Sequence, residues 1–170
     1  NDYVLKATAK ALKNNKHILV SLDGDQIIKR AHVNIGMAVA LEDGLIVPVI
    51  KDADKMSLGE ISETARDLAE RARTNKLSMD EYKGSTFSIS NLGMFGVETF
   101  NPIINQPDAG ILGVCAVQDE LVMDDAGAIT KRQFMRISFT FDHRLIDGAT
   151  AAKFELAIRD LMEHPMQILL

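Results

Sequence analysis

The spacing of apolar residues predicts three helices along the chain. Apolar side chains recur at helical spacing over residues 4–12. The clearest helix starts where the segment S-L-G-E at 57–60 has the form of a capping box, ahead of an apolar stripe over residues 58–72. A third helix follows Gly148, carries apolar residues on one face and ends before Pro165.

Short runs of apolar and β-branched residues predict strands between these helices. Residues 86–90 alternate cleanly, with Phe87 and Ile89 on one face and the polar residues on the other. The run 45–50 is apolar on both faces and looks like an interior strand, although Pro48 requires an edge, a bulge or a strand start. The other predicted strands span residues 17–22, 26–30, 33–41, 111–117 and a long stretch that ends at 141.

Strands, hairpins and helices alternate irregularly, without an internal repeat or a domain boundary. Turn residues at 23–25 and 124–127 each predict a hairpin between two of the strands. We therefore expect an α/β fold, in which a mixed β-sheet has helices packed on one face.

The composition is that of one soluble domain. Of its 170 residues, 46% are hydrophobic and 25% charged, and the formal net charge of −5 argues against a broad basic surface for nucleic acid or anionic lipid. A single Cys excludes an intrachain disulfide. The longest apolar stretch, residues 109–117, is far shorter than the ~20 residues of a membrane-spanning helix. We expect neither nucleic acid nor a membrane as partner.

Several common chemical motifs are absent from the sequence. There is no G-x-x-x-x-G-K-S/T phosphate loop, no dinucleotide fingerprint and no G-x-S-x-G elbow. The four His residues do not fall at metal-ligand spacings, and residues 52–54 resemble the start of a calcium loop without its later Gly and Glu. The sequence therefore predicts no metal site.

His143 is the first candidate for chemistry. It lies between the last predicted strand and the last helix, where a rigid backbone on both sides could hold a general base at a cleft. Packing of the ring under the loop is the alternative for His143. Asp147, four residues later, has two structural interpretations: it caps the helix that follows, or it pairs with an arginine such as Arg144.

Ser90 is the second candidate. It ends the alternating strand on its polar side, next to a glycine-containing loop, where its hydroxyl could project into a cleft. The alternative is that the Ser90 hydroxyl caps the turn at 91–93. Cys115 lies within the apolar run I-L-G-V-C-A-V and is interpreted as a small buried hydrophobe rather than a nucleophile.

Four ordered blocks carry a resemblance to a known family. They are T-F-S-I-S-N-L-G-M-F-G at 86–96, N-P-I-I-N-Q-P at 101–107, I-L-G-V at 111–114 and F-D-H-R-L-I-D-G-A at 141–149. Together they resemble the catalytic domain of dihydrolipoamide acyltransferases, the core component of 2-oxo acid dehydrogenase complexes. The likeness runs over essentially the whole chain. It is more specific than H-x-x-x-D-G alone, which the wider superfamily shares with chloramphenicol acetyltransferase and with condensation domains.

This resemblance implies a chloramphenicol acetyltransferase-like fold, trimers that build a large core, and acyl transfer between a dihydrolipoyl thiol and coenzyme A. It implies that His143 is the catalytic base, that Asp147 is the motif aspartate and that Ser90 stabilises the oxyanion. In the family the active site forms between subunits. Proton transfer from a thiol with a pKa of ~8.5 to an imidazole near ~6.5 is uphill by only about 2.7 kcal/mol, so an ordinary histidine is an adequate base.

The resemblance also implies the surroundings of the reaction. The lipoyl group would sit on a separate lipoyl domain, and coenzyme A would be a substrate bound by residues that stay unassigned, without a metal. Expected partners are other copies of the chain in a homotrimer, a 2-oxo acid or acetoin dehydrogenase component and dihydrolipoamide dehydrogenase. The location would be the bacterial cytoplasm, or the mitochondrial matrix in a eukaryote. The family's domain begins earlier, so residues 1–170 are expected to be a catalytic domain that lacks its N-terminal segment.

Residues 91–96 look most like the acetyl-transferring members that serve pyruvate or acetoin, rather than succinyl or branched-chain forms. Two alternatives remain. The chain could be a core-forming scaffold without activity, or another coenzyme A or carrier-thioester acyltransferase of the same fold. The presence of both His143 and Ser90 argues against the scaffold.

Overall fold

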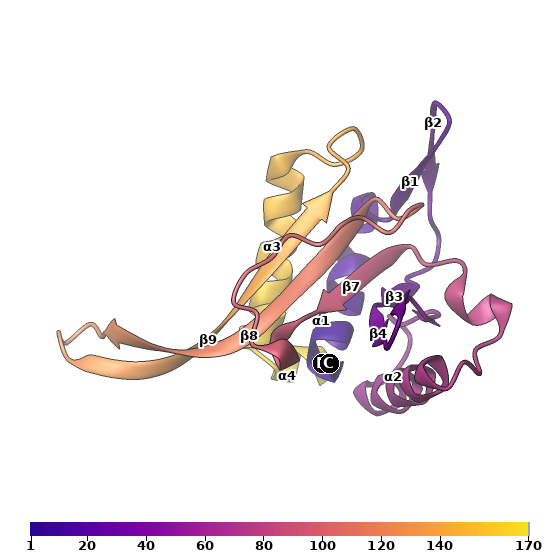
Figure 1. Ribbon diagram of the computed structural model, residues 1–170. Coiled ribbons are helices and arrows are strands. Elements are labelled where there is room, and N and C mark those ends of the chain that lie inside the picture. Colours follow the sequence, from indigo (N-terminus) through magenta and orange to yellow (C-terminus); the bar gives the residue numbers. More distant parts are fainter. Residues whose placement is uncertain (170) are drawn as a thin grey trace.

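The computed structural model describes residues 1–169 (Figure 1). Within this range none of the helices combines the length and the apolar character that crossing a bilayer requires. The elements in chain order are α1 (Asp2–Asn14), η1 (Lys16–Ile18), β1 (Val20–Asp23), β2 (Gln26–Lys29), β3 (Ile35–Met37), β4 (Val39–Leu41), β5 (Gly44–Ile46), β6 (Val49–Ile50), α2 (Leu58–Arg73), η2 (Met79–Tyr82), β7 (Phe87–Asn91), η3 (Gly93–Phe95), β8 (Gly110–Met123), β9 (Ile129–Phe141), α3 (Gly148–Glu163) and α4 (Met166–Leu169).

The central sheet is mixed, as the sequence predicts. Its five strands lie in the order β6-β3-β7-β8-β9. The pairs β3–β7 and β7–β8 are parallel, whereas β6 and β9 join the two edges antiparallel. Two small hairpins, β1–β2 and β4–β5, lie outside this sheet, and β8 and β9 continue together as the long arm drawn in orange in Figure 1.

The two faces of the sheet are covered differently. On one face the ring of Phe87 packs edge-on against Phe154 of α3, with centroids 5.5 Å apart, and α1 packs against both α2 and α3. On the other face lies the segment 96–109, whose Phe100 carbonyl accepts a hydrogen bond of 2.7 Å from the Ser138 hydroxyl (Figure 1). The predicted placement of helices on one face is thus confirmed.

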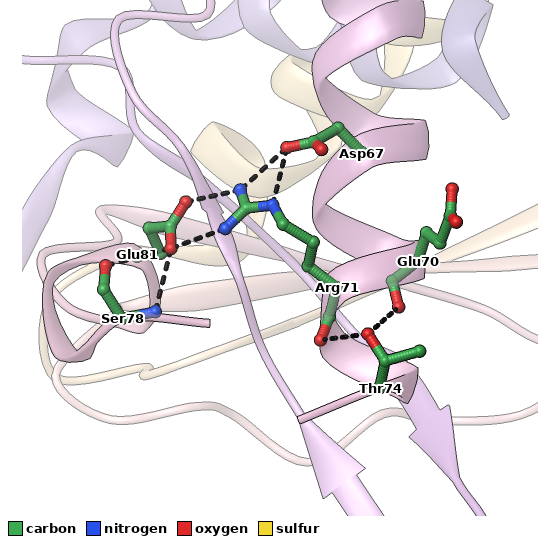
Figure 2. A network of polar contacts seen from close by, with 6 residues as sticks. All are labelled: Asp67, Glu70, Arg71, Thr74, Ser78 and Glu81. Atoms are coloured by element: carbon green, nitrogen blue, oxygen red, sulfur yellow. Dashed lines mark hydrogen bonds and ion pairs between the residues drawn. The ribbon is translucent and has the colours of Figure 1, made fainter. Parts of the chain in front are cut away.

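Helix α2 begins as its sequence predicts. The Ser57 hydroxyl accepts from the Glu60 amide, and the Glu60 carboxylate accepts from the Ser57 amide, so both halves of the capping box form. Figure 2 shows how the other end of α2 is tied to η2, because Arg71 donates to both Asp67 and Glu81. The guanidinium of Arg71 lowers the pKa of Glu81 to about 2.

Three predicted strands differ from those observed, each for an identifiable reason. The run 17–22 begins as the 3-10 turn η1, so only its second half joins β1. The run 33–41 divides at Ala38 because its two halves pair with different strands: β3 pairs with β6 and β7 in the central sheet, whereas β4 pairs with β5 in a separate hairpin. The run 45–50 divides at 47–48 because Pro48 has no amide hydrogen, which leaves β6 as a two-residue edge strand.

Candidate active site

Ser90 lies where two parallel strands end at a cavity. The carboxyl ends of β3 and β7 open into a space of about 720 Å³, and the half-buried Ser90 lines it. Among the described residues the Ser90 hydroxyl has no hydrogen-bond partner, whereas the neighbouring Asn91 carboxamide oxygen accepts from the Gly93 amide at 2.9 Å. The turn at 91–93 is therefore capped by Asn91, and the interpretation of Ser90 as its cap is wrong.

The walls of this cavity combine apolar side chains with two cations. Met94 and Phe95 of η3 line it beside Ser90, and Arg66 and Arg73 of α2 line it from the helix. Neither arginine forms an ion pair with any of residues 1–169. Ser90 thus lines a space that also has, on one wall, two arginines that are unpaired within residues 1–169.

His143 lies in the turn that follows β9. Asp142 organises this turn: its carboxylate accepts from the Arg144 amide and guanidinium, and its carbonyl accepts from the amides of Leu145 and Ile146. The imidazole of His143 is exposed, with its ring centroid 5.5 Å from that of Phe141. The alternative that the ring is packed under the loop is therefore wrong.

Asp147 is the N-cap of α3. Its carboxylate accepts from the Thr150 amide at 2.9 Å and from the Thr150 hydroxyl at 2.7 Å, and these bonds lower the pKa of Asp147. Arg144 pairs with Asp142 at 2.6 Å and not with Asp147. Of the two structural interpretations, the cap is thus confirmed and the pairing with Arg144 is wrong. The cap fixes the chain on the C-terminal side of His143.

A second cavity, of about 910 Å³, borders the His143 turn. Asp142, Arg144 and Leu145 line one side, and residues 102–108 line the other. This loop carries a buried polar cluster that sequence reasoning missed, in which Asp108 accepts hydrogen bonds from Ser85 and Ser88. The one signal for this cluster in the sequence is the alternation of 86–90, which places Ser88 on the polar face of the strand.

Cys115 is buried, as expected.

Ser90 and His143 do not meet within one chain. Gly113 of β8 pairs with Ser90 on one side and with Ser138 on the other. The turn begins three residues beyond Ser138, after Phe141. At about 3.3 Å per residue and about 4.8 Å between strands, Ser90 lies roughly 10 Å along the strands and about 10 Å across them from the end of β9. A hydroxyl and an imidazole cannot cooperate directly over that separation.

Comparison with known proteins identifies the family. The family model for the 2-oxoacid dehydrogenases acyltransferase (catalytic domain) matches residues 1–170. The chain belongs to this family. The dihydrolipoyllysine-residue succinyltransferase component of the 2-oxoglutarate dehydrogenase complex from Rickettsia typhi is 44% identical over 168 residues, which cover 99% of this chain and 42% of that protein. The dihydrolipoyllysine-residue acetyltransferase component of the pyruvate dehydrogenase complex from Zymomonas mobilis is 45% identical over 170 residues, covering 99% and 38%. The chain thus spans about two fifths of the length of these curated relatives.

Solved structures agree with this assignment. The cubic core of a pyruvate dehydrogenase multienzyme complex superposes with a TM-score of 0.93 at 40% identity, covering 99% of this chain and 70% of that one. A structure of Azotobacter vinelandii dihydrolipoamide acetyltransferase, on the catalytic role of a serine, a histidine and an asparagine, gives the same values. Chloramphenicol acetyltransferase matches at a TM-score of 0.59 and 14% identity, covering 99% and 77%, which shows a shared fold. The family resemblance and the expected fold are confirmed.

Proposed function

We propose that this chain transfers an acyl group between the thiol of a dihydrolipoyl group and the thiol of coenzyme A. The observation that carries the proposal is the family match over residues 1–170. The site geometry supports it, because the Ser90 hydroxyl, which has no hydrogen-bond partner in the described part of the chain, lines a cavity, and the exposed His143 imidazole lies on a turn that is held on both sides.

The reaction we propose needs one base and one hydrogen-bond donor. His143 accepts the proton of the attacking thiol, and the resulting thiolate forms a bond to the thioester carbonyl carbon while the carbonyl electron pair moves to oxygen. The Ser90 hydroxyl donates a hydrogen bond to that oxyanion. When the tetrahedral intermediate collapses, the other carbon–sulfur bond breaks and the departing sulfur takes the proton from His143. Because both sulfurs are similar acids, the same residues serve either direction.

The separation of Ser90 from His143 supports a site shared between two copies of the chain. If both residues act on one carbonyl, each must come from a different copy, as the family resemblance implies. A cyclic assembly meets this need, since each copy presents one surface to each neighbour. We therefore propose a homotrimer that builds a larger core, and the relative with a cubic core supports such an assembly.

We assign Asp147 the role of positioning the His143 turn through the helix cap. The Azotobacter vinelandii enzyme supports this role, because its studied histidine and asparagine lie four residues apart, as His143 and Asp147 do here. Asn and Asp are similarly effective N-caps. Both Asn and Asp can cap a helix, whereas only Asp can place a negative charge near His143. We therefore assign capping as the role of this residue.

The relatives suggest the remaining participants. Their complexes are named for pyruvate, 2-oxoglutarate and acetoin, so we propose a 2-oxo acid or acetoin dehydrogenase component and dihydrolipoamide dehydrogenase as partners. The lipoyl group would arrive on a separate domain and coenzyme A would be a substrate. The relatives include bacterial proteins and a mitochondrial one, which is consistent with the bacterial cytoplasm or the mitochondrial matrix.

We propose acetyl as the acyl group, on the basis of residues 91–96 and the apolar Met94 and Phe95 beside Ser90. A methyl group needs no charged partner. Succinyl is the second candidate, and one observation favours it: Arg66 and Arg73 line the same cavity without an ion pair to any of residues 1–169, and either could bind a carboxylate. Relatives with both activities match this chain about equally well.

One steady-state experiment tests these proposals together. Acetyl-, succinyl- and isobutyryl-coenzyme A are offered with free dihydrolipoamide, and kcat/KM is measured for each. We expect acetyl transfer to be fastest. Faster succinyl transfer that falls specifically in Arg66→Ala or Arg73→Ala would select the second candidate. An assembled protein that transfers none of the three groups would contradict the proposed activity and favour the scaffold.

A further inference from the structure

Asp108 is a buried carboxylate that the proposed reaction does not use. It is 4% exposed and lies two residues before the start of β8, the strand between β7 and β9. Each carboxylate oxygen accepts one serine hydroxyl: Oδ1 from Ser85 at 2.9 Å and Oδ2 from Ser88 at 2.6 Å. Ser88 lies two residues before Ser90 on the same face of β7. The carboxylate thus binds the strand that presents the Ser90 hydroxyl.

The same cluster fixes the loop that walls the cavity beside His143. The Asn105 side-chain amide donates to Ser88 Oγ at 3.2 Å, and the Asp108 amide donates to the Asn105 carbonyl at 3.0 Å. Because Ser88 Oγ already accepts from Asn105, its own proton is directed to Asp108. The loop 102–108 is thereby held against β7 by a closed set of hydrogen bonds.

The residue after Asp108 connects to the His143 turn. The Ala109 carbonyl accepts from the Asp142 amide at 2.8 Å, and the Asp142 carbonyl accepts from the amides of Leu145 and Ile146. Two peptide bonds, Asp108–Ala109 and Asp142–His143, and the hydrogen bond between Ala109 and Asp142 therefore connect the Asp108 backbone to His143. The Asp108 side chain thus binds the Ser90 strand, and the next residue, Ala109, binds the His143 turn.

The buried environment of Asp108 disfavours its ionised form. Burial raises the pKa of Asp108 to about 6, although the hydroxyls of Ser88 and Ser85 and the positive charge of Arg30, which follows β2, act in the opposite direction. Arg30 also donates to the Ser21 hydroxyl at 2.9 Å, so it is already partly satisfied. Burial therefore makes the ionised form of Asp108 unfavourable relative to the protonated form.

We propose that Asp108 is a positioning residue that sets the His143 turn relative to the Ser90 strand. This inference rests on the proposed function. In an assembly with shared sites, each chain contributes Ser90 to one site and His143 to another. Loss of the Asp108 side chain would therefore disturb both sites to which that chain contributes.

The experiment compares Asp108→Ala with Asp108→Asn in the assembled protein. Alanine leaves both serine hydroxyls without an acceptor. Asparagine can accept from Ser88 through its carbonyl oxygen and donate to Ser85 through its amide. We expect Asp108→Ala to lower kcat per folded chain by about 10- to 100-fold with KM for acetyl-coenzyme A unchanged, because a small displacement of reacting groups has effects of this size. Asp108→Asn should recover kcat to within a few-fold of the wild type.

A second readout is independent of activity. Hydrogen–deuterium exchange should be faster for peptides covering residues 140–146 in Asp108→Ala, and near wild type in Asp108→Asn. Asp125→Asn, an exposed acid in the turn between β8 and β9, is the matched control and should change neither readout. Should Asp108→Ala fail to fold, Ser88→Ala replaces it, because it breaks the link to β7 and keeps the carboxylate.

The outcomes separate this inference from the proposed function. Unchanged kcat and unchanged exchange at 140–146 in folded Asp108→Ala, or in its replacement, would overturn the positioning role. A wild-type protein without acyl transfer would overturn the proposed function. The hydrogen–deuterium exchange results would then be the only test of the positioning role.

The pH dependence of the melting temperature provides a further check on the buried charge. Since the pKa is raised in the folded state, wild type should lose stability relative to Asp108→Asn as pH rises from 4 through about 6.

Discussion

The two segments that carry the candidate site residues are held in different ways. Ser90 belongs to β7, whose ladders to β3 and β8 on both sides fix its place in the centre of the sheet. His143 belongs to the six-residue connection 142–147 outside the ladder, held by the Asp142 carbonyl, the Asp142–Arg144 ion pair and the Asp147 cap. The hydroxyl is therefore positioned by the ladders of the sheet, and the imidazole by local bonds within its turn together with the hydrogen bond from Asp142 to Ala109.

This difference matches the chemistry that we propose for each residue. A donor to a developing oxyanion is effective only if its position is fixed before the reaction. A base that accepts a proton from one sulfur and returns it to another must be reachable and must adjust slightly between the two. Substitutions in the two segments should therefore have effects on kcat, KM and stability that differ in size and in kind.

Removal of the base should have the largest effect. His143→Ala is expected to lower kcat by ~10²–10⁴-fold with folding intact, the range for loss of a general base. The exposed side chain contributes little to packing, so the circular dichroism spectrum and the assembly size should not change. Near-wild-type turnover in this variant would refute the catalytic role and favour the scaffold.

Removal of the oxyanion donor should have the next largest effect. Ser90→Ala is expected to lower kcat by ~10²–10³-fold with little change in KM, because the hydroxyl meets only the developing charge. Ser62→Ala, on the α2 wall of the same cavity, is the matched control and should leave kcat within a few-fold of the wild type. A rise in KM at constant kcat would instead make Ser90 a contact to the bound substrate.

Mixed assemblies test whether the two segments act in the same site from different chains. Co-expression of His143→Ala with Ser90→Ala chains should restore activity, because some interfaces receive an intact residue from each parent. With equal amounts and random mixing, about a quarter of head-to-tail interfaces would be wild type at both positions, so about a quarter of wild-type activity is expected.

Subunit composition must be measured in the same experiment, by native mass spectrometry of differently tagged chains. Recovered activity should rise and fall with the fraction of mixed interfaces as the input ratio is varied. Mixed assemblies that form and yet stay as inactive as either parent would disprove the shared site.

The smallest effect is expected at the helix cap. Asp147→Ala should lower the melting temperature by a few degrees and kcat by about tenfold or less, since the His143 turn keeps its other braces, whereas Asp147→Asn should resemble the wild type. The pKa of Asp147 is lowered in the folded state, so the wild-type advantage over Asp147→Ala should be present above pH ~4 and lost as pH falls below it. An Asp147→Asn variant as inactive as His143→Ala would show that the charge itself is required.

Local signals in the sequence determined much of this protein. The capping box at Ser57 placed the start of α2 correctly, and the alternation around Ile89 placed Ser88 and Ser90 on the face opposite the helices. The hairpin at 124–127 and the cap at Asp147 also followed from neighbouring residues. Each of these features depends on contacts within a few positions of the chain, and short-range periodicity and turn chemistry report such contacts.

The tertiary structure decided what depends on partners far along the chain. The run 33–41 divides because β3 pairs with β7, 52 positions later, whereas β4 pairs with its neighbour β5. Strand β6 lies in the central sheet because it pairs with β3 at the edge. The burial of Asp108 depends on serines 20 and 23 positions away, and nothing in its own neighbourhood in the sequence marks it. The separation of Ser90 from His143 is likewise set by the register of three strands. Pairing across a sheet is selected by the packing of the whole domain, so the local pattern that makes a strand does not specify which strand it joins.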